Sequence, residues 1–274
     1  MKGISFGQYY PGESLLHRLD PRIKIVMAVL YTVCTFLCKS AVSFLALIVS
    51  IFLMMLISRI PVKVILRSIR PLMVIIAFTF FINIFWTQGE GTPLVEWGFF
   101  RIYQEGLWNA AFMFLRIFSL VTGTGLFLTY TTTPMDLTDG LEALLSPLKK
   151  LHVPVHVFAM MMSITLRFIP TLSEETEKIM NAQKARGADF SSGSLVKRAK
   201  ALIPILIPLF VSAINRALDL ANAMECRCYH GGEGRTRLRA LKCHLRDLFA
   251  LVAILLLGAG ILLLNTVALG YVMK

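Results

Sequence analysis

The sequence predicts an all-α membrane protein, with a polytopic bundle of about five spans and a cytoplasmic helical domain in which two long helices cross. The first reason is composition: 56% of the residues are hydrophobic, only 16% are charged and the mean hydropathy is +0.70, whereas soluble domains carry about 25% charged residues. The second is a set of apolar runs of nearly bilayer length. The third is a long basic segment whose apolar stretches continue into charged, helix-periodic sequence.

Five apolar runs are the candidate spans, at 23–38, 41–57, 72–87, 106–130 and 248–272. A spanning helix needs about 20 apolar residues, so the first and third runs require flanking residues or a locally thinned bilayer. A buried core helix of a soluble protein is the alternative for these two. The polar N-terminal sequence has no early apolar core, so we expect no cleaved signal peptide.

The Lys and Arg residues of the connections alternate between many and few. The N-terminal tail and the second connection each hold four cations, the first connection holds only Lys39, and the third holds only Arg101. The segment 131–244 then contains fifteen. Because cytoplasmic connections are enriched in Lys and Arg, we expect the N-terminus and the long segment in the cytoplasm and the C-terminus outside.

The long basic segment contains two apolar stretches, "VHVFAMMMSITLRFIP" and "LIPILIPLFVSAI". A transmembrane hairpin is one interpretation. Arg167 interrupts the first stretch, and Pro204 and Pro208 are expected to break the second. Both stretches continue into amphipathic sequence, which favours two long helices that lie against the inner face of the membrane and cross each other.

A shorter helix, about 136–151, should precede the crossing pair, because it has Asp136 near its start and Lys149 and Lys150 near its end, as the helix dipole prefers. The predicted organisation is therefore an N-terminal membrane domain at 1–133, a cytoplasmic domain at 134–244 and a final membrane span within 245–274.

Motifs for catalysis or nucleotide binding are absent from the sequence. It contains no Walker A pattern, no HExxH and no GxSxG, so we do not expect an enzyme or an ATP site. Cys226, Cys228 and His230 are soft donors, but the C-x-C spacing is not typical of a zinc site, and no bound metal is expected. In a chain this apolar, the net charge of +12 is a topology signal rather than a nucleic-acid signal.

Arg116 lies midway along the fourth span, where an Arg costs about 2.5–3.5 kcal/mol on insertion scales. It should therefore face the interior of the bundle. One interpretation is contact with a partner or a polar path. The other is a structural hydrogen bond to Asn83 or to backbone carbonyls.

Two Arg residues stand between small neighbours near the ends of the two long helices: Ala185, Arg186 and Gly187, and then Cys226, Arg227 and Cys228. Helix capping is the simpler explanation, with Gly187 as a natural C′ residue. Small neighbours also leave a guanidinium accessible, and its five donors suit carboxylates and backbone oxygens. We therefore interpret both Arg residues as docking tips.

The stretches "YYPGESLLHRLDPRIKI", "KARG", "AMECRCY" and "GGEGRTR" resemble the transmembrane T component, EcfT, of energy-coupling factor (ECF) transporters. The resemblance covers nearly the whole chain and implies a membrane bundle plus a cytoplasmic coupling domain. In that family each X-Arg-X tip docks on one of two ATP-binding-cassette ATPases, EcfA and EcfA′. The second tip departs from the usual Ala-Arg-Gly by two Cys residues.

The resemblance also implies a non-catalytic subunit of an importer for vitamins or other micronutrients, in the membrane of a bacterial or archaeal cell. ATP and Mg²⁺ would bind to the ATPases, and substrate choice would belong to a small membrane protein, the S component. The apolar faces of the crossed helices would form a platform for that component, built from Phe158, Met160, Met161, Met162, Leu206, Leu209 and Phe210.

Two other classes of protein stay open. A self-contained transporter driven by an ion gradient should carry acidic residues within its spans, and the sequence shows none there. A membrane enzyme should present clustered His, Asp or Ser residues at one depth, and the spans lack such a cluster.

Overall fold

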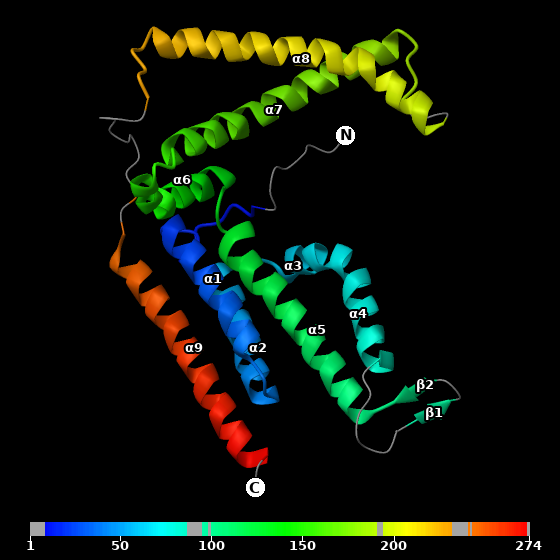
Figure 1. The fold of residues 1–274 in the computed structure, drawn as a ribbon, viewed down its shortest axis with the longest axis vertical. Helices are drawn as coiled ribbons and strands as arrows, with labels where there is room; N and C mark the ends of the chain where they lie inside the picture. The colour runs from blue at the N-terminus through cyan, green and yellow to red at the C-terminus, as the bar shows by residue number, and fades with distance from the viewer. Residues whose placement is uncertain are drawn as a thin grey trace. The chain divides into compact units, whose positions relative to one another are not determined.

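A computed structural model describes residues 9–86, 95–97, 100–190, 194–231, 241 and 243–272. Helices dominate the described chain, which confirms the predicted fold class, and one short antiparallel hairpin, β1 (Val95–Trp97) with β2 (Phe100–Ile102), lies between two of them. The α-helices are α1 (Pro21–Leu37), α2 (Ala41–Ser58), α3 (Val62–Ile69), α4 (Met73–Trp86), α5 (Gln104–Thr124), α6 (Pro134–Leu145), α7 (Val155–Ala185), α8 (Leu195–Glu225) and α9 (Leu245–Val272) (Figure 1). Short 3-10 segments cover Arg70–Leu72 and Ser146–Leu151, and a π-helical turn covers Gly125–Thr129.

The chain forms two compact units, Met1–Ala143 with Leu241–Lys274, and Leu144–Ala240. The division falls after Ala143 rather than after residue 133, so most of α6 belongs with the membrane bundle. The cause is a close approach of α6 to the start of α1: a Cβ on Gly140 would lie 3.0 Å from the Cβ of Pro21. Most of the Gly-rich connector, at 232–240, lies outside the described residues.

Six helical segments of the described chain are long and apolar enough to cross a membrane: Ala41–Ser58, Val62–Ile84, Gly106–Thr129, Val155–Ala185, Val196–Glu225 and Leu245–Thr266. Four of them match predicted spans. The other two are α7 and α8, which the sequence analysis assigns to the cytoplasmic domain. The predicted first span corresponds to α1, which has only 17 residues.

The unit Met1–Ala143 with Leu241–Lys274, called the membrane unit from here on, is built around α1, which packs against α5 and α9 (Figure 1). Tyr31 of α1 is completely buried and its ring lies 5.8 Å from that of Phe127. A Cβ on Gly123 of α5 would lie 2.0 Å from Cε1 of Tyr31. The absence of a side chain at position 123 therefore allows α1 and α5 to pack this closely.

The turn between α1 and α2 is held by a side chain from the last helix. Asn265 of α9 donates from its amide nitrogen to the carbonyl of Leu37 at 2.7 Å, and its oxygen accepts from the hydroxyl of Ser43 at 2.7 Å and from the backbone N–H of Lys39 at 3.3 Å. The end of α1 is thus satisfied by protein groups rather than by water. A 17-residue helix spans roughly 25 Å, and these bonds explain how α1 can end short of a full crossing.

A polar cluster joins the opposite end of the same helices. Asp20 is the N-cap of α1 and accepts from the backbone N–H of Arg22, while its own N–H donates to the buried carboxylate of Asp247 at 2.9 Å. Lys24 is 1% exposed and its ammonium donates to the carbonyls of Thr131, at 2.8 Å, and His17. These bonds connect the N-terminal segment, the end of the α5 region and the start of α9.

The second unit contains α7 and α8, each 31 residues long. The prediction that Pro204 and Pro208 break the second stretch is wrong, because α8 continues through both. The two prolines are four residues apart and therefore lie on one side of the helix, and both are exposed. The carbonyls that lose a donor there can meet groups outside the helix.

Candidate functional site

The crossing of α7 and α8 is held by a polar contact in the charged half of α7 (Figure 1). Glu175 accepts from the hydroxyl of Ser212 at 2.6 Å and from the guanidinium of Arg216 at 2.9 Å. The Nε of Arg216 also donates to the Ser212 hydroxyl, at 3.4 Å. Both carboxylate oxygens of Glu175 are used, so α7 is joined to α8 through two donors of α8.

The first docking tip ends α7 in a Schellman motif. Gly187 has φ +86, in the left-handed region, and its N–H donates to the carbonyl of Lys184 at 2.9 Å. The N–H of Ala188 donates to the carbonyl of Gln183 at 3.0 Å. These are the two bonds that define the motif, with Gly at the C′ position, so Arg186 is the C-cap residue of α7.

The second docking tip ends α8 with the same pair of backbone bonds. Cys228 has φ +54, and its N–H donates to the carbonyl of Glu225 at 2.9 Å. The N–H of Tyr229 donates to the carbonyl of Met224 at 3.0 Å. Cys228 therefore takes the C′ position that Gly187 takes in the first tip, and Arg227 stands in the same place as Arg186.

Both Arg side chains are exposed, and so are the small residues beside them. Neither guanidinium forms a hydrogen bond or an ion pair with another residue of the described chain. The carbonyls of Gln183 and Lys184 in α7, and of Met224 and Glu225 in α8, accept from backbone N–H groups. Capping of these carbonyls therefore does not use either guanidinium. The C-terminal ends of α7 and α8 point away from each other across the crossing (Figure 1), and the unit therefore presents two separate cationic tips.

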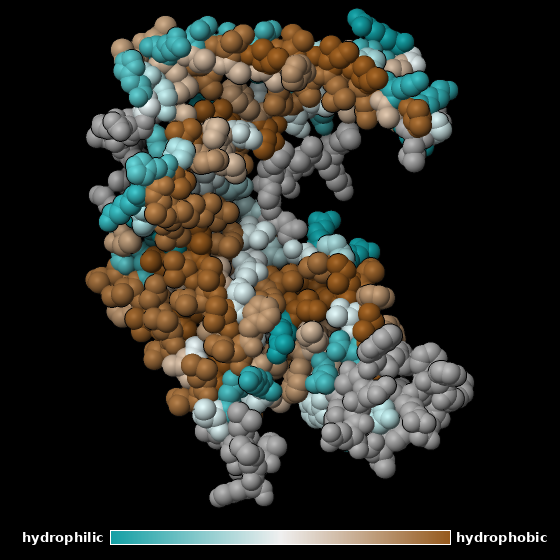
Figure 2. Space-filling view, in the orientation of Figure 1, coloured by the Kyte–Doolittle hydropathy of each residue, from teal (hydrophilic) through white to brown (hydrophobic). Residues whose placement is uncertain are grey.

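The predicted platform residues lie in the apolar parts of α7 and α8. Met161 and Met162 are about half exposed, at 47% and 52%, so they do not form an ordinary core in this chain. Phe158, Leu206 and Phe210 are also exposed, whereas Met160 and Leu209 are half-buried. Hydrophobic residues gather over the middle of these helices and hydrophilic residues at their ends (Figure 2). An apolar surface of this extent is typical of a face that meets a partner or a membrane.

Arg116 and Asn83 have different partners within the described chain. The guanidinium of Arg116 donates to the carbonyl of Cys38 at 3.1 Å and lies 5.8 Å from the centre of the Phe44 ring. The amide of Asn83 donates to the carbonyl of Thr79, one turn earlier in its own helix. Of the interpretations offered by the sequence, the hydrogen bond from Arg116 to a backbone carbonyl is the one present.

The described residues hold no group of three His, Cys, Asp or Glu side chains placed to bind a metal ion. Cys226 and Cys228 are exposed and free. Their position on either side of Arg227 makes them part of the second tip.

Comparison with known sequences assigns the chain to a family. Residues 12–238 match the family model CbiQ, described as cobalt transport protein. The energy-coupling factor transporter transmembrane protein EcfT of Clostridium kluyveri is 49% identical over 257 residues, which cover 94% of this chain and 95% of that protein. The chain belongs to the EcfT family. The EcfT protein of Brevibacillus brevis is 51% identical over 93% of this chain and 96% of that protein. The EcfT protein of Bacillus subtilis is 46% identical over 94% of this chain and 97% of that protein.

As a member of the EcfT family, the chain is a multi-pass transmembrane component of an energy-coupling factor transporter. The family match includes both predicted docking tips and the predicted platform, since residues 155–228 lie inside the matched range.

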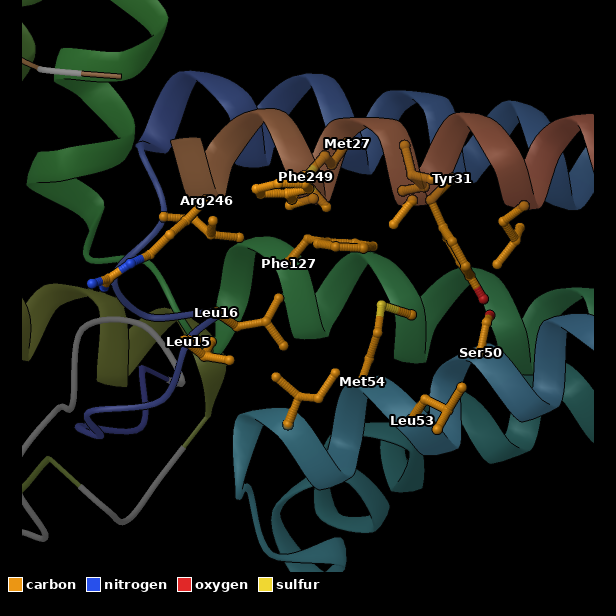
Figure 3. Close-up of a pocket in the computed structure, with 16 residues that line it drawn as sticks. Leu15, Leu16, Met27, Tyr31, Ser50, Leu53, Met54, Phe127, Arg246 and Phe249 are labelled. Carbon is orange, nitrogen blue, oxygen red and sulfur yellow. The ribbon is translucent and has the colours of Figure 1, made fainter. Parts of the chain in front are cut away.

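The EcfT chain also contains a pocket that sequence reasoning missed. It has a volume of about 530 Å³ and lies in the membrane unit, between α2 and α9, with α1 and the π-helical turn as its floor (Figure 3). Tyr31, Ser50 and Arg246 are the polar residues among its 16 lining residues. The one available signal in the sequence was Arg246, a cation at the start of the last span.

Proposed function

We propose that this chain is the coupling subunit of an ECF-type importer, in which it transmits the motion of two ATPases to a substrate-binding membrane protein. One ATPase holds the tip with Arg186 and the other holds the tip with Arg227. The S component, which captures a vitamin or another micronutrient, rests on the apolar platform. ATP and Mg²⁺ bind to the ATPases and not to this chain.

The observation that carries this proposal is the identical construction of the two tips. Two helices end in the same pair of backbone hydrogen bonds, each with an exposed Arg directly before a left-handed residue. The hydrogen bonds that close each helix end come from backbone N–H groups, which leaves both guanidinium groups available to a partner. Two equal tips suit two related grooves, as a pair of ATPases provides.

The charges of the membrane unit support a cytoplasmic location for the crossed helices. The end of the bundle where α1 and α9 begin and α2 finishes holds many cations: Arg18, Arg22, Lys24, Arg59, Lys63 and Arg246. The opposite turn, between α1 and α2, contains only Lys39. By the positive-inside rule the cation-rich end faces the cytoplasm. The chain leaves the bundle toward α6 at that end, because α5 runs back toward it (Figure 1).

The proposed mechanism depends on the contact that joins the two crossed helices. Closure of the ATPase dimer moves the two grooves toward each other, and each tip follows its groove because a buried guanidinium separated from its partners costs several kcal/mol. The contact between Glu175 and its partners on α8 keeps the two helices together while their ends move. The platform above the crossing then shifts, and its flexible Met residues adapt to the moving surface.

The test is co-purification of the complete ECF complex with paired substitutions. Arg186→Ala with Arg227→Ala removes both tips. Arg198→Ala with Lys200→Ala is the control, because it removes two exposed cations from α8 and leaves the tips and the Glu175 contact intact. We expect the tip variant to enter the membrane and to lose both ATPases, since an interface Arg of this kind contributes at least about 2 kcal/mol, roughly thirtyfold in affinity. The control should retain them. Full assembly of the tip variant would rule out docking through these side chains.

A further inference from the structure

We infer that the pocket between α2 and α9 binds one acyl chain of an anionic phospholipid, with the lipid phosphate on Arg246. This inference is independent of the proposed coupling function, because it concerns only the membrane unit.

The pocket exists because α2 and α9 touch at one end and separate at the other. At the touching end Asn265 of α9 accepts from the hydroxyl of Ser43 of α2 at 2.7 Å. Toward the other end Leu53 and Ile57 of α2 and Phe249 of α9 line opposite sides of the opening. In Figure 3 the rings of Phe127 and Tyr31 lie between the two helices and form the floor.

The lining of the pocket favours hydrocarbon over water. A volume of about 530 Å³ equals roughly eighteen waters at about 30 Å³ each, and each buried water needs two to four polar partners. Tyr31 and Ser50 supply polar atoms at one end and Arg246 at the other. The stretch between these ends is lined by Leu, Met, Ile, Phe and Ala. Water would therefore lack partners there, whereas an acyl chain would match the lining.

The residues beside the opening place it at the lipid-facing surface of the bundle. Leu53 is 52% exposed and Phe249 is 74% exposed. The neighbouring residues of α2 and α9, such as Leu56 and Leu256, are equally apolar and exposed. An acyl chain can therefore enter sideways from the bilayer and displace no polar group.

Arg246 gives the site its preference for charge. Its aliphatic stem borders the pocket while its nitrogen atoms point out of the pocket at the end near Leu15 and Leu16 (Figure 3), the arrangement in which long cations extend to the membrane interface. Within the described residues its guanidinium has no hydrogen bond and no ion pair. This end of the bundle is also the cation-rich end, where anionic headgroups are attracted. The unpaired cation and the apolar space together match the two parts of one anionic phospholipid.

The experiment uses the full chain in nanodiscs of phosphatidylcholine that contain a trace of phosphatidylglycerol with a photoreactive acyl chain. A phosphatidylcholine with the same photoreactive chain is the second probe, and labelled residues are mapped by mass spectrometry. Ala253→Trp fills the pocket from α9. Ala259→Trp is its control, because Ala259 is exposed on the same helix and does not line the pocket. Arg246→Gln keeps the pocket and removes the charge.

We expect the phosphatidylglycerol probe to label Leu53 and Phe249 in the unsubstituted chain and in Ala259→Trp, and to lose this labelling in Ala253→Trp. Arg246→Gln should reduce the preference for phosphatidylglycerol over phosphatidylcholine about fivefold, the contribution of one cation near the membrane surface. Equal labelling by both probes in the unsubstituted chain would overturn the inference. So would pocket residues that crosslink to a second polypeptide instead of to lipid, or labelling that Ala253→Trp leaves unchanged.

Discussion

Replacing Cys228 by Gly should stabilise the end of α8, and replacing Gly187 by Ala should destabilise the end of α7 by a similar amount. Both residues have left-handed backbones, with φ +54 and φ +86, a conformation that costs an L-residue with a side chain roughly 1–2 kcal/mol. A Cβ at position 187 would meet nothing within 4 Å, so the backbone conformation alone sets the effect there.

The net change should be about 1 kcal/mol in each case. Glycine gives the frayed helix end more freedom than other residues do, which offsets about 0.5–1 kcal/mol of the difference in either direction. About 1 kcal/mol corresponds to roughly a fivefold change in the equilibrium between the closed and the open helix end.

Hydrogen exchange of two amides measures this change directly. The N–H of Ala188 closes the motif of α7 and the N–H of Tyr229 closes that of α8. We expect Gly187→Ala to speed exchange at Ala188 and Cys228→Gly to slow it at Tyr229, with exchange in the middle of both helices unchanged. Faster exchange at Tyr229 in Cys228→Gly would show that backbone strain does not set the stability of the second tip.

Three other perturbations test the rest of the structure. Gly123→Ala should lower the unfolding free energy, measured by denaturant unfolding in detergent, by about 1–3 kcal/mol, because its Cβ would meet the buried ring of Tyr31 at 2.0 Å. Gly260→Ala is the control and should leave unfolding unchanged, because a Cβ there meets nothing within 4 Å. Equal effects of the two substitutions would refute the close packing of α1 and α5. Asn265→Leu leaves the backbone groups of the α1–α2 turn without partners and should cost at least about 2 kcal/mol in the same assay, so an unchanged midpoint would show that the turn is satisfied otherwise. The pKa of Glu175 lies below its usual 4.5, first because Ser212 donates to the carboxylate and then because Arg216 does. The ionised carboxylate therefore contributes its full stabilisation above about pH 4.5, and this stabilisation is lost as the pH falls through the lower pKa of the folded state. In Glu175→Gln the loss of stability over this pH range should be absent from the acid unfolding profile.

Local features of the tips and helices followed from sequence. Gly187 after a long helix predicted a C′ residue, and the left-handed φ of +86 agrees. Asp136 was expected near the start of a helix, and it accepts from the hydroxyl of Thr133 at 2.6 Å while its N–H donates back to that hydroxyl. Such features are readable because capping depends on residues within one turn of each other.

Contacts between distant residues did not follow from sequence. Asp20 meets Asp247, and Leu37 meets Asn265, across more than two hundred residues, and no helical period in either segment indicates its partner. The left-handed backbone of Cys228 was also beyond local reasoning, because Cys has no preference for that conformation. The prediction that Pro204 and Pro208 interrupt a helix was wrong, because α8 continues through both prolines, which lie exposed on one side of the helix.

The shared backbone path of the two tips carries a consequence for assembly. A groove that recognises only the backbone shape of one tip accepts the other equally well, so backbone shape does not discriminate between the two tips. The residues that precede the tips differ in sign: Lys184 stands before the first and Glu225 before the second, and both are exposed. If two ATPases hold the tips as proposed, this pair of opposite charges and the two Cys residues beside Arg227 are what distinguish one tip from the other.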